Sequence, residues 1–328
     1  MKYFSIANSY ANEYMWISND YTGNENWLRE RAIHAQLSSV GSESGIVQYH
    51  GATSNRDRGD EKWIQRIYME YCPHGDLMDL LCEHAKTDGR DPKLDENSQP
   101  IPQVRIPTRA LWSFFKDLTS AACIMESGYD PLGNDYRAAD DWEEIIHRDL
   151  KPGNIFLAAP LAKTSRGIPV CKLGDFGLAV PREYDPLRNP EDMLHPGTPG
   201  WKAPEFNRYP PDFEVSHELT SATDIWAIGR VMLALMELPV RRLPVVRYDD
   251  ENEGRVDVQE KVQLVATHGE DLYGLVEKCL EPTPEDRIRA QHLLRAIDRQ
   301  INNLSVPLPL ELKEGDVLEY VQELRWAT

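Results

Sequence analysis

The segment from His147 to Asn154 constrains this chain more than any other part of the sequence. It reads His-Arg-Asp-Leu-Lys-Pro-Gly-Asn, so a carboxylate, an amine and an amide fall within six positions. Two further short segments follow, Asp-Phe-Gly at 175–177 and Ala-Pro-Glu at 203–205. Each is short, but three such segments in one order restrict the fold far more than any one of them does.

These segments resemble the catalytic motifs of eukaryotic-type serine/threonine protein kinases. Residues 147–154 are similar to the catalytic loop H-R-D-L-x-x-x-N, and the later two segments are similar to D-F-G and A-P-E. The resemblance covers about residues 2 to 300. It implies an α+β, two-lobed protein-kinase-like fold, with a truncated small β-rich N-lobe and a mainly helical C-lobe.

The resemblance also implies roles for the polar residues of these motifs. Phosphoryl transfer needs a positioned hydroxyl, an acceptor for its proton and neutralisation of the charge on the phosphate oxygens. Asp149 would orient and deprotonate the substrate hydroxyl, and Lys151 would steady the γ-phosphate. Asn154 and Asp175 would hold Mg²⁺, which prefers hard oxygen ligands. For the two aspartates, simple turn capping is the competing interpretation.

A nucleotide-binding hinge is expected where the run Met69-Glu70-Tyr71-Cys72 follows a strand-like segment. By the resemblance, Met69 is the gatekeeper, and the backbone of Glu70 and Cys72 binds the adenine edge. Asp76 is placed to reach the ribose. A strand that simply ends in a turn is the alternative.

The start of the chain departs from the family pattern, because no G-x-G-x-x-G is present near it. The family's ATP-binding lysine then has one upstream candidate, Lys2, and its glutamate partner is expected at Glu30, with Glu25 as a competitor. An exposed terminal lysine is the alternative for Lys2. We expect the first two strands of the small lobe to be missing, which favours an incomplete N-terminus.

Two further residues resemble structural parts of the family. Asp224 resembles the aspartate that binds the backbone of the catalytic loop. Arg287 resembles the arginine that pairs with the glutamate of A-P-E, here Glu205.

Composition limits the function classes. The 328 residues carry a net charge of −18, which argues against a nucleic-acid partner because such proteins need cationic surface. The five scattered cysteines form no metal-binding or disulfide pattern. No signal peptide is expected at residues 1–10, because they contain no apolar run of the required length. The apolar run 225–238 contains Arg230 and Glu237, so a buried helix is expected there instead of a membrane span. The expected location is intracellular, cytoplasmic or nuclear.

The pattern along the chain predicts strands and one helix first, followed by helices. Strands are expected at 1–6, 46–50 and 63–71, and helices at 27–37, 77–84, 108–126 and in most of 215–300. Residues 86–107 and 128–144 are expected to be polar insertions, and 315–325 a final helix. The predicted units are 1–72 (partial N-lobe), 73–303 (C-lobe) and 304–328 (C-terminal extension).

The leading functional hypothesis is an ATP- and Mg²⁺-dependent kinase whose partners are proteins with Ser/Thr acceptors. Lys151 and the run Gly-Thr-Pro-Gly-Trp at 197–201 favour Ser/Thr over Tyr. Tyr184 is the only hydroxyl side chain between Gly177 and Gly197, so activity is not expected to need Ser/Thr phosphorylation there. A pseudokinase that acts as an interaction module is the alternative.

Overall fold

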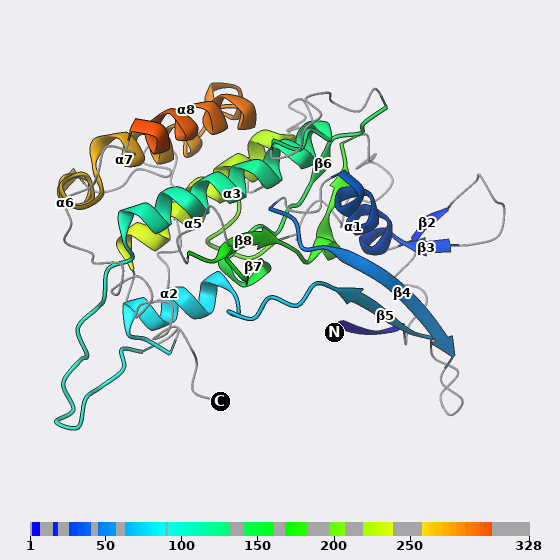
Figure 1. Ribbon diagram of the computed structural model, residues 1–328, viewed down its shortest axis with the longest axis horizontal. Coiled ribbons are helices and arrows are strands. Elements are labelled where there is room, and N and C mark those ends of the chain that lie inside the picture. The colour runs from blue at the N-terminus through cyan, green and yellow to red at the C-terminus, as the bar shows by residue number, and fades with distance from the viewer. Residues whose placement is uncertain are drawn as a thin grey trace, which may run out of the picture.

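The computed structural model describes residues 2–6, 16–18, 26–40, 45–56, 63–88, 91–131, 141–160, 168–182, 197–206, 219–238 and 258–303 (Figure 1). The strands are β1 (Lys2–Ile6), β2 (Trp16–Ser18), β3 (Asn26–Leu28), β4 (Tyr49–Arg56), β5 (Trp63–Met69), β6 (Ile145–Ile146), β7 (Ile155–Ala158), β8 (Val170–Leu173) and β9 (Val180–Pro181). The helices are α1 (Arg29–Val40), α2 (Leu77–Ala85), α3 (Thr108–Ser127), α5 (Ser221–Glu237), α6 (Val258–His268), α7 (Glu270–Cys279) and α8 (Ala290–Asn303). Short 3₁₀ turns are η2 (Pro152–Asn154), η3 (Phe176–Leu178), η5 (Pro204–Phe206) and η6 (Pro284–Asp286).

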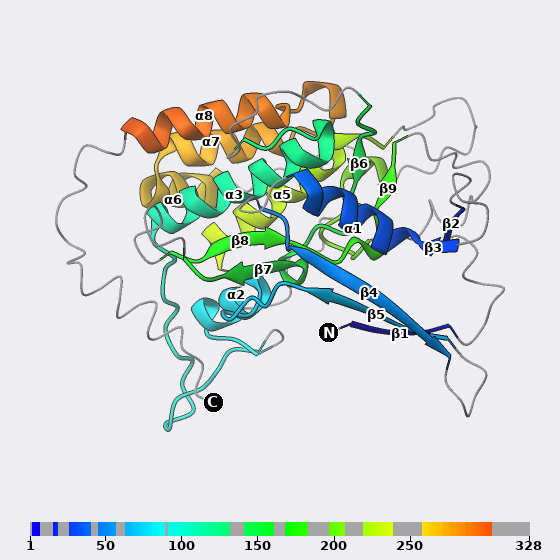
Figure 2. The same ribbon diagram turned by 45° about the vertical axis from the view of Figure 1, so that its right-hand side comes forward.

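The first part of the chain forms a small lobe around a three-stranded antiparallel sheet in the order β1-β5-β4. Helix α1 lies beside this sheet and buries Ile33 and Leu37 on its inner face (Figures 1 and 2). Among the described residues, strand β1 occupies one edge of this sheet. An antiparallel strand at an edge leaves its outer backbone groups without sheet partners.

Two predicted boundaries in this lobe were wrong. Trp27 was expected to begin the helix, but it lies in β3 and pairs with Ile17 of β2, so α1 begins at Arg29. The strand expected from Ile46 begins at Tyr49, because Ile46 instead forms an isolated parallel bridge with Leu173 of β8. Apolar spacing alone does not distinguish a helix start from a short strand with a distant partner.

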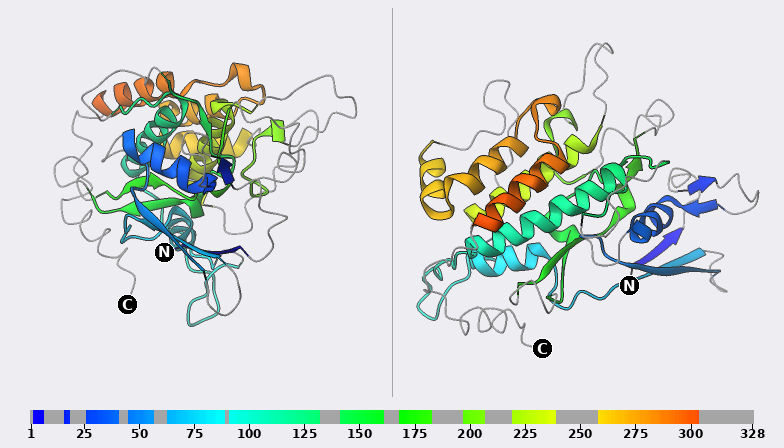
Figure 3. Two further views of the ribbon diagram at one scale, coloured as in Figure 1. Left: turned by 90° about the vertical axis from the view of Figure 1, so that its right-hand side faces the viewer. Right: turned by 45° about the horizontal axis from the view of Figure 1, so that its top comes forward.

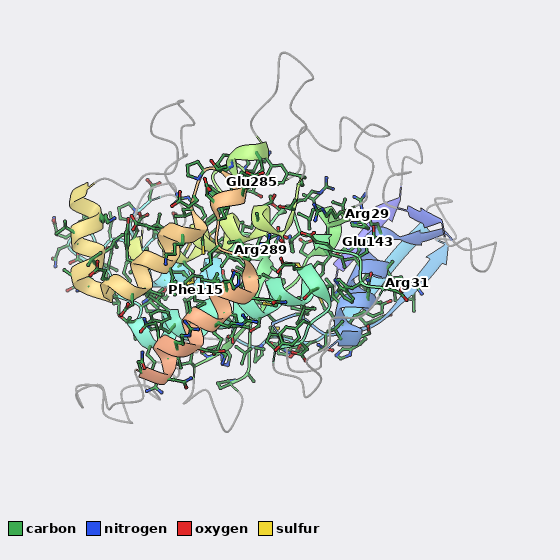
Figure 4. All side chains as sticks on the ribbon, turned by 90° about the horizontal axis from the view of Figure 1, so that it is seen from above. Arg29, Arg31, Phe115, Glu143, Glu285 and Arg289 are labelled. Atoms are coloured by element: carbon green, nitrogen blue, oxygen red, sulfur yellow. The ribbon has the colours of Figure 1, made fainter. Side chains whose placement is uncertain are left out.

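The large lobe is built around α3 and α5, which lie side by side with α7 and α8 packed outside them (Figure 3). Helix α5 is buried on nearly all sides, which confirms that the apolar run near its centre is a core element. At Gly229 a Cβ would lie 2.6 Å from the Cβ of Cys279, so the absence of a side chain lets α7 approach closely. Figure 4 shows Phe115 of α3 within this lobe, while Arg29 and Arg31 mark α1 at the opposite end. In the described part of the chain, no helix has both the length and the apolarity to cross a membrane.

The segment between α2 and α3 has more regular structure than its polar composition predicts. Isolated bridges join Thr87 to Pro92 and Leu94 to Pro100, so the described residues of this segment fold back on one another. The Nε2 of Gln103 then donates to the carbonyl of Leu238 at 2.6 Å and fastens the segment to the end of α5. The other insertion, 128–144, is described only in part, and the expected helix at 315–325 lies outside the described residues.

A buried ion pair fastens η5 to the turn before α8. Arg287 donates from Nη1 and Nη2 to the two carboxylate oxygens of Glu205 at 2.6 and 2.7 Å, and neither side chain is more than 3% exposed. Arg287 also donates to three backbone carbonyls, those of Ala222, Glu281 and Pro282. The predicted pairing is therefore confirmed, and it joins the segment after Thr198 to the large lobe.

Glu205→Ala is expected to lower the free energy of unfolding by about 3–5 kcal/mol, because it leaves the Arg287 guanidinium buried without its carboxylate. Arg287→Lys should also destabilise the chain, because an ammonium cannot form the two-pronged contact. Urea unfolding checks both variants. Glu277→Ala in the exposed Lys261–Glu277 pair is the control, with an expected change below about 1 kcal/mol. If Glu205→Ala and Glu277→Ala lowered the free energy of unfolding equally, the buried pair would not have the stabilising role assigned to it.

Candidate active site

The backbone of residues 147–149 is held by a carboxylate from the core. Asp224, 2% exposed near the start of α5, accepts the peptide N–H of His147 at 2.8 Å and that of Arg148 at 3.3 Å. The Nδ1 of His147 accepts the N–H of Asp149, so its Nε2 carries the proton and donates to the carbonyl of Gly174. Burial is the main cause that lowers the pKa of His147, which agrees with a neutral ring. Arg148 adopts a left-handed backbone with φ of 66°, a conformation that costs energy for a residue with a Cβ.

Four polar side chains converge just after this loop. The Nζ of Lys151 donates to Oδ2 of Asp149 at 2.7 Å and to Oγ1 of Thr198 at 2.6 Å. Thr198 donates to the other carboxylate oxygen of Asp149 at 2.7 Å. Asn154 donates from Nδ2 to the backbone carbonyl of Asp149 at 2.8 Å. The Asp149 carboxylate is therefore oriented by three neighbours, while its side chain keeps 11% of its surface exposed.

Asp175 lies beside this cluster because two short strands pair. Strands β7 and β8 are antiparallel, with Ile155 opposite Leu173, and the N–H of Gly174 donates to the carbonyl of Asn154 at 3.0 Å. Asp175 comes next in the chain and also has a left-handed backbone, with φ of 62°. The predicted metal-binding residues Asn154 and Asp175 are thus brought to one place from positions 21 residues apart.

Glu30 reaches the same region from α1. A Cβ built at Gly177 would lie 3.3 Å from Oδ1 of Asp175 and 3.5 Å from Oε2 of Glu30. Glu30 is only 3% exposed. The structure therefore places the predicted glutamate next to the Asp-Phe-Gly segment, whereas its competitor Glu25 lies outside the described residues.

The oxygen atoms in this region suit a hard cation. The amide nitrogen of Asn154 is committed to Asp149, which leaves its carbonyl oxygen to serve as a ligand beside the carboxylate of Asp175. Within the described ranges, no three His, Cys, Asp or Glu side chains gather into a cage that would hold a metal without other ligands. Mg²⁺ commonly binds through one or two protein oxygens together with phosphate and water, so the residues fit that ion.

An aromatic column, which sequence reasoning missed, joins the lobes behind the site. The ring of Phe176 packs between His34 of α1 and His147 of the catalytic loop, at centroid distances of 5.1 and 5.2 Å and with the rings tilted by 49° and 53°. His34 also contacts Tyr49 of β4, and its Nε2 lies 2.6 Å from the carbonyl of Val47. Only the position of Phe176 in a motif gave any signal, because His34 stands in a polar helix where it resembles a surface residue.

The expected hinge lies between β5 and α2. Met69 ends β5, and the N–H of Glu70 donates to the carbonyl of Gln48 at 2.8 Å. Cys72 is partly buried, and burial is the main cause that raises the pKa of its thiol to about 11. Asp76 accepts the N–H groups of Met78 and Asp79 through Oδ1, so it caps α2. Its predicted contact with a ribose stays a prediction.

A second feature that the sequence did not reveal is an ion pair behind the hinge. Lys172 of β8 donates to both carboxylate oxygens of Glu70 at 2.9 and 2.7 Å, and its side chain is 8% exposed. Glu70 also accepts the N–H of Gln48 at 3.2 Å. The hinge is thereby tied to β8 and to the segment that follows α1.

Lys2 lies in β1, where its Cα is opposite Ile67 of β5. The structure gives no description of its side chain, so its pairing with Glu30 stays a prediction.

Comparison with known proteins identifies the family. A sequence model described as the protein kinase domain matches residues 142–296, which include the catalytic loop, Asp175 and the Ala-Pro-Glu segment. This chain contains a protein kinase domain. The kinase domain accounts for the α+β fold and for the clustering of Asp149, Lys151 and Asn154.

Curated relatives are also named as protein kinases. The chain is 26% identical over 307 residues to the G2-specific protein kinase nim-1 of Neurospora crassa, covering 89% of this chain and 30% of that protein. It is 25% identical over 261 residues to the G2-specific protein kinase fin1 of Schizosaccharomyces pombe, covering 76% and 30%. It is 32% identical over 153 residues to the serine/threonine-protein kinase ppk34 of the same yeast, covering 46% and 37%. The chain thus spans about 30% of the length of the first two relatives.

The Asp224 carboxylate gives the kinase domain a testable pH dependence. Burial is the main cause that raises the pKa of Asp224 to about 7, against the opposing hydrogen bonds from His147 and Arg148. Between about pH 4 and 7 the folded chain therefore holds a proton that the unfolded chain has released, so its stability falls as pH rises through this window.

We expect Asp224→Asn to make this fall shallower, by up to about 1.4 kcal/mol per pH unit. Denaturant unfolding at pH 5, 6 and 7 measures the slope for both proteins. Asp91→Asn, at an exposed position, is the control and should keep the native slope. An unchanged slope in Asp224→Asn would contradict the prediction.

Lys172→Met is expected to lower the free energy of unfolding by about 1–3 kcal/mol, because Glu70 then loses the cation that compensates its partial burial. Adding Glu70→Gln to this variant should recover part of the loss, which a double-mutant cycle detects. The control is Lys93→Met, which removes a more exposed ion pair with Glu83. Strictly additive effects of the two hinge substitutions would show that the pair is not coupled.

Proposed function

We propose that this kinase domain transfers the γ-phosphate of ATP to Ser or Thr hydroxyls of protein substrates. The observation that carries the proposal is the convergence of Asp149, Lys151, Asn154 and Thr198 beside Asp175. This set supplies a proton acceptor, an amine and oxygen ligands within one small region, which are the elements that phosphoryl transfer requires.

In the proposed reaction, the incoming hydroxyl of the substrate hydrogen-bonds to Asp149 and passes its proton to that carboxylate. Lys151 already contacts Asp149 and is the cation available to steady the charge of the transferred group. Asn154 and Asp175 would hold Mg²⁺, which neutralises phosphate charge when it is bound. The substrate oxygen forms a bond to the γ-phosphorus of ATP. The bond between that phosphorus and the oxygen bridging the β- and γ-phosphates breaks, and ADP leaves with the bridging oxygen.

In the proposed ATP complex, the hinge backbone at Glu70 and Cys72 binds the adenine edge. Met69 is the gatekeeper residue, and Asp76 contacts the ribose. Lys2 and Glu30 would form the pair that orients the phosphates. The burial of Glu30 next to Asp175 supports its part in this assignment.

The proposed units are residues 1–72 as the small lobe, 73–303 as the large lobe and 304–328 as a C-terminal extension. Five cysteines without disulfide partners favour a reducing, intracellular location. Proteins with Ser/Thr acceptors are the proposed partners, because the Thr198 segment stands at the catalytic cluster and relatives are named serine/threonine-protein kinases.

The competing function is a pseudokinase that binds partners without transferring phosphate. The set of polar residues around Asp149 favours activity. Transfer of labelled γ-phosphate to a Ser/Thr peptide mixture separates the two, because a pseudokinase leaves the peptides unlabelled.

Asp149→Asn is expected to lower this transfer by about 10²–10⁴-fold, because an amide cannot accept the proton. The melting temperature should change little, since the amide keeps nearly the same shape. Phosphopeptide mass spectrometry identifies the acceptor residues, and Asp91→Asn serves as the matched control. If Asp149→Asn retained native activity, Asp149 would not be the base.

A further inference from the structure

Lys202 lies in the turn that carries Thr198 to the catalytic cluster. This turn begins at Gly197, with φ of 88°, and the N–H of Trp201 donates to the carbonyl of Thr198 at 3.1 Å. A Cβ at Gly197 would lie 2.5 Å from the carbonyl oxygen of Arg148 and 3.5 Å from both Cγ and Cε of Lys202. The stem of Lys202 therefore passes close to Gly197, at the point where the turn meets the backbone carbonyl of Arg148.

The ammonium of Lys202 belongs electrostatically to the same site. Partial burial is the main cause that lowers the pKa of Lys202, and the negative charge of Asp149 opposes that change. Asp149 is already hydrogen-bonded by Lys151 and Thr198. The Asp149 carboxylate thus interacts with two amines, in a chain whose net charge is −18.

A substrate peptide has to approach this turn closely. Its acceptor hydroxyl needs to lie within about 3.2 Å of Asp149, and each residue of an extended peptide advances only about 3.3 Å. Side chains one or two residues from the acceptor therefore fall within reach of a cation that interacts with Asp149. In the catalytic loop itself, Gly153 contributes no side chain, and a Cβ built there would meet nothing within 4 Å.

We propose that Lys202 is a specificity-determining residue that favours substrates with an Asp or Glu side chain within two residues of the acceptor hydroxyl. The inference rests on the proposed function and names its substrate class. The negative net charge of the whole chain would by itself favour basic substrates. The ammonium of Lys202 instead favours an acidic side chain next to the acceptor.

The test compares paired Ser peptides that differ only by Asp or Asn at each position from two before to two after the acceptor. The native chain should phosphorylate the best Asp peptide with kcat/KM roughly tenfold above that of its Asn partner, as one charge-assisted contact gives. In Lys202→Met this ratio should fall to about 1, whereas Lys202→Arg should keep most of it and Lys202→Glu should invert it. Taking the ratio cancels any general loss of activity in the variants.

Lys278→Met, at an exposed position on α7, is the control and should keep the native ratio. Raising the salt concentration should reduce the native ratio, because screening weakens a charge contact. If the native chain phosphorylates the Asn peptides but shows no preference for Asp, or if Lys202→Met keeps the preference, the inference is overturned and the proposed function stands. If no peptide is phosphorylated by the native chain, the proposed function fails and the inference fails with it.

Discussion

The carboxylate of Asp224 holds the peptide N–H groups of His147 and Arg148, and the geometry of the whole site depends on that contact. Asp224 lies near the start of α5, a helix that is buried on nearly all sides. Its two hydrogen bonds therefore fix the backbone of the catalytic loop, which has little regular structure, to the core of the large lobe. Arg148 and Asp175 both adopt left-handed backbone conformations, which persist only where the surroundings determine them strongly. The hydrogen bonds of Asp224 and His147 are part of those surroundings.

The charged side chains at the site form two separate groups, one with both signs of charge and one of carboxylates alone. Asp149 is matched by Lys151 and by the more distant Lys202, while Asp175 and Glu30 lie together near Gly177. The first group faces the segment that carries Thr198, and the second group lies where oxygen ligands for a cation gather. This separation fits a reaction in which a hydroxyl and a metal-bound phosphate approach from different sides.

The two lobes are joined by contacts that lie outside the catalytic motifs. The Glu70–Lys172 pair ties the hinge to β8, the bridge between Ile46 and Leu173 joins the segment after α1 to the same strand, and the column through Phe176 links α1 to the catalytic loop. All three contacts end within a few residues of Asp175. A shift of α1 or of the hinge would therefore change the position of the candidate metal ligand Asp175.

The sequence by itself predicted the family, the candidate site residues Asp149, Lys151, Asn154 and Asp175, and the long helices α3 and α5, because motif spacing and apolar periodicity are local properties. It also indicated Glu30 and the Glu205–Arg287 pair, through resemblance and not through any local signal. Only the tertiary structure decided that Trp27 is in a strand, and that His34, Lys172, Thr198 and Lys202 lie in or around the site. Each of these depends on a partner far away in the chain, such as Ile17, Glu70 or Asp149, and pairing over such separations follows from packing, which no local pattern records.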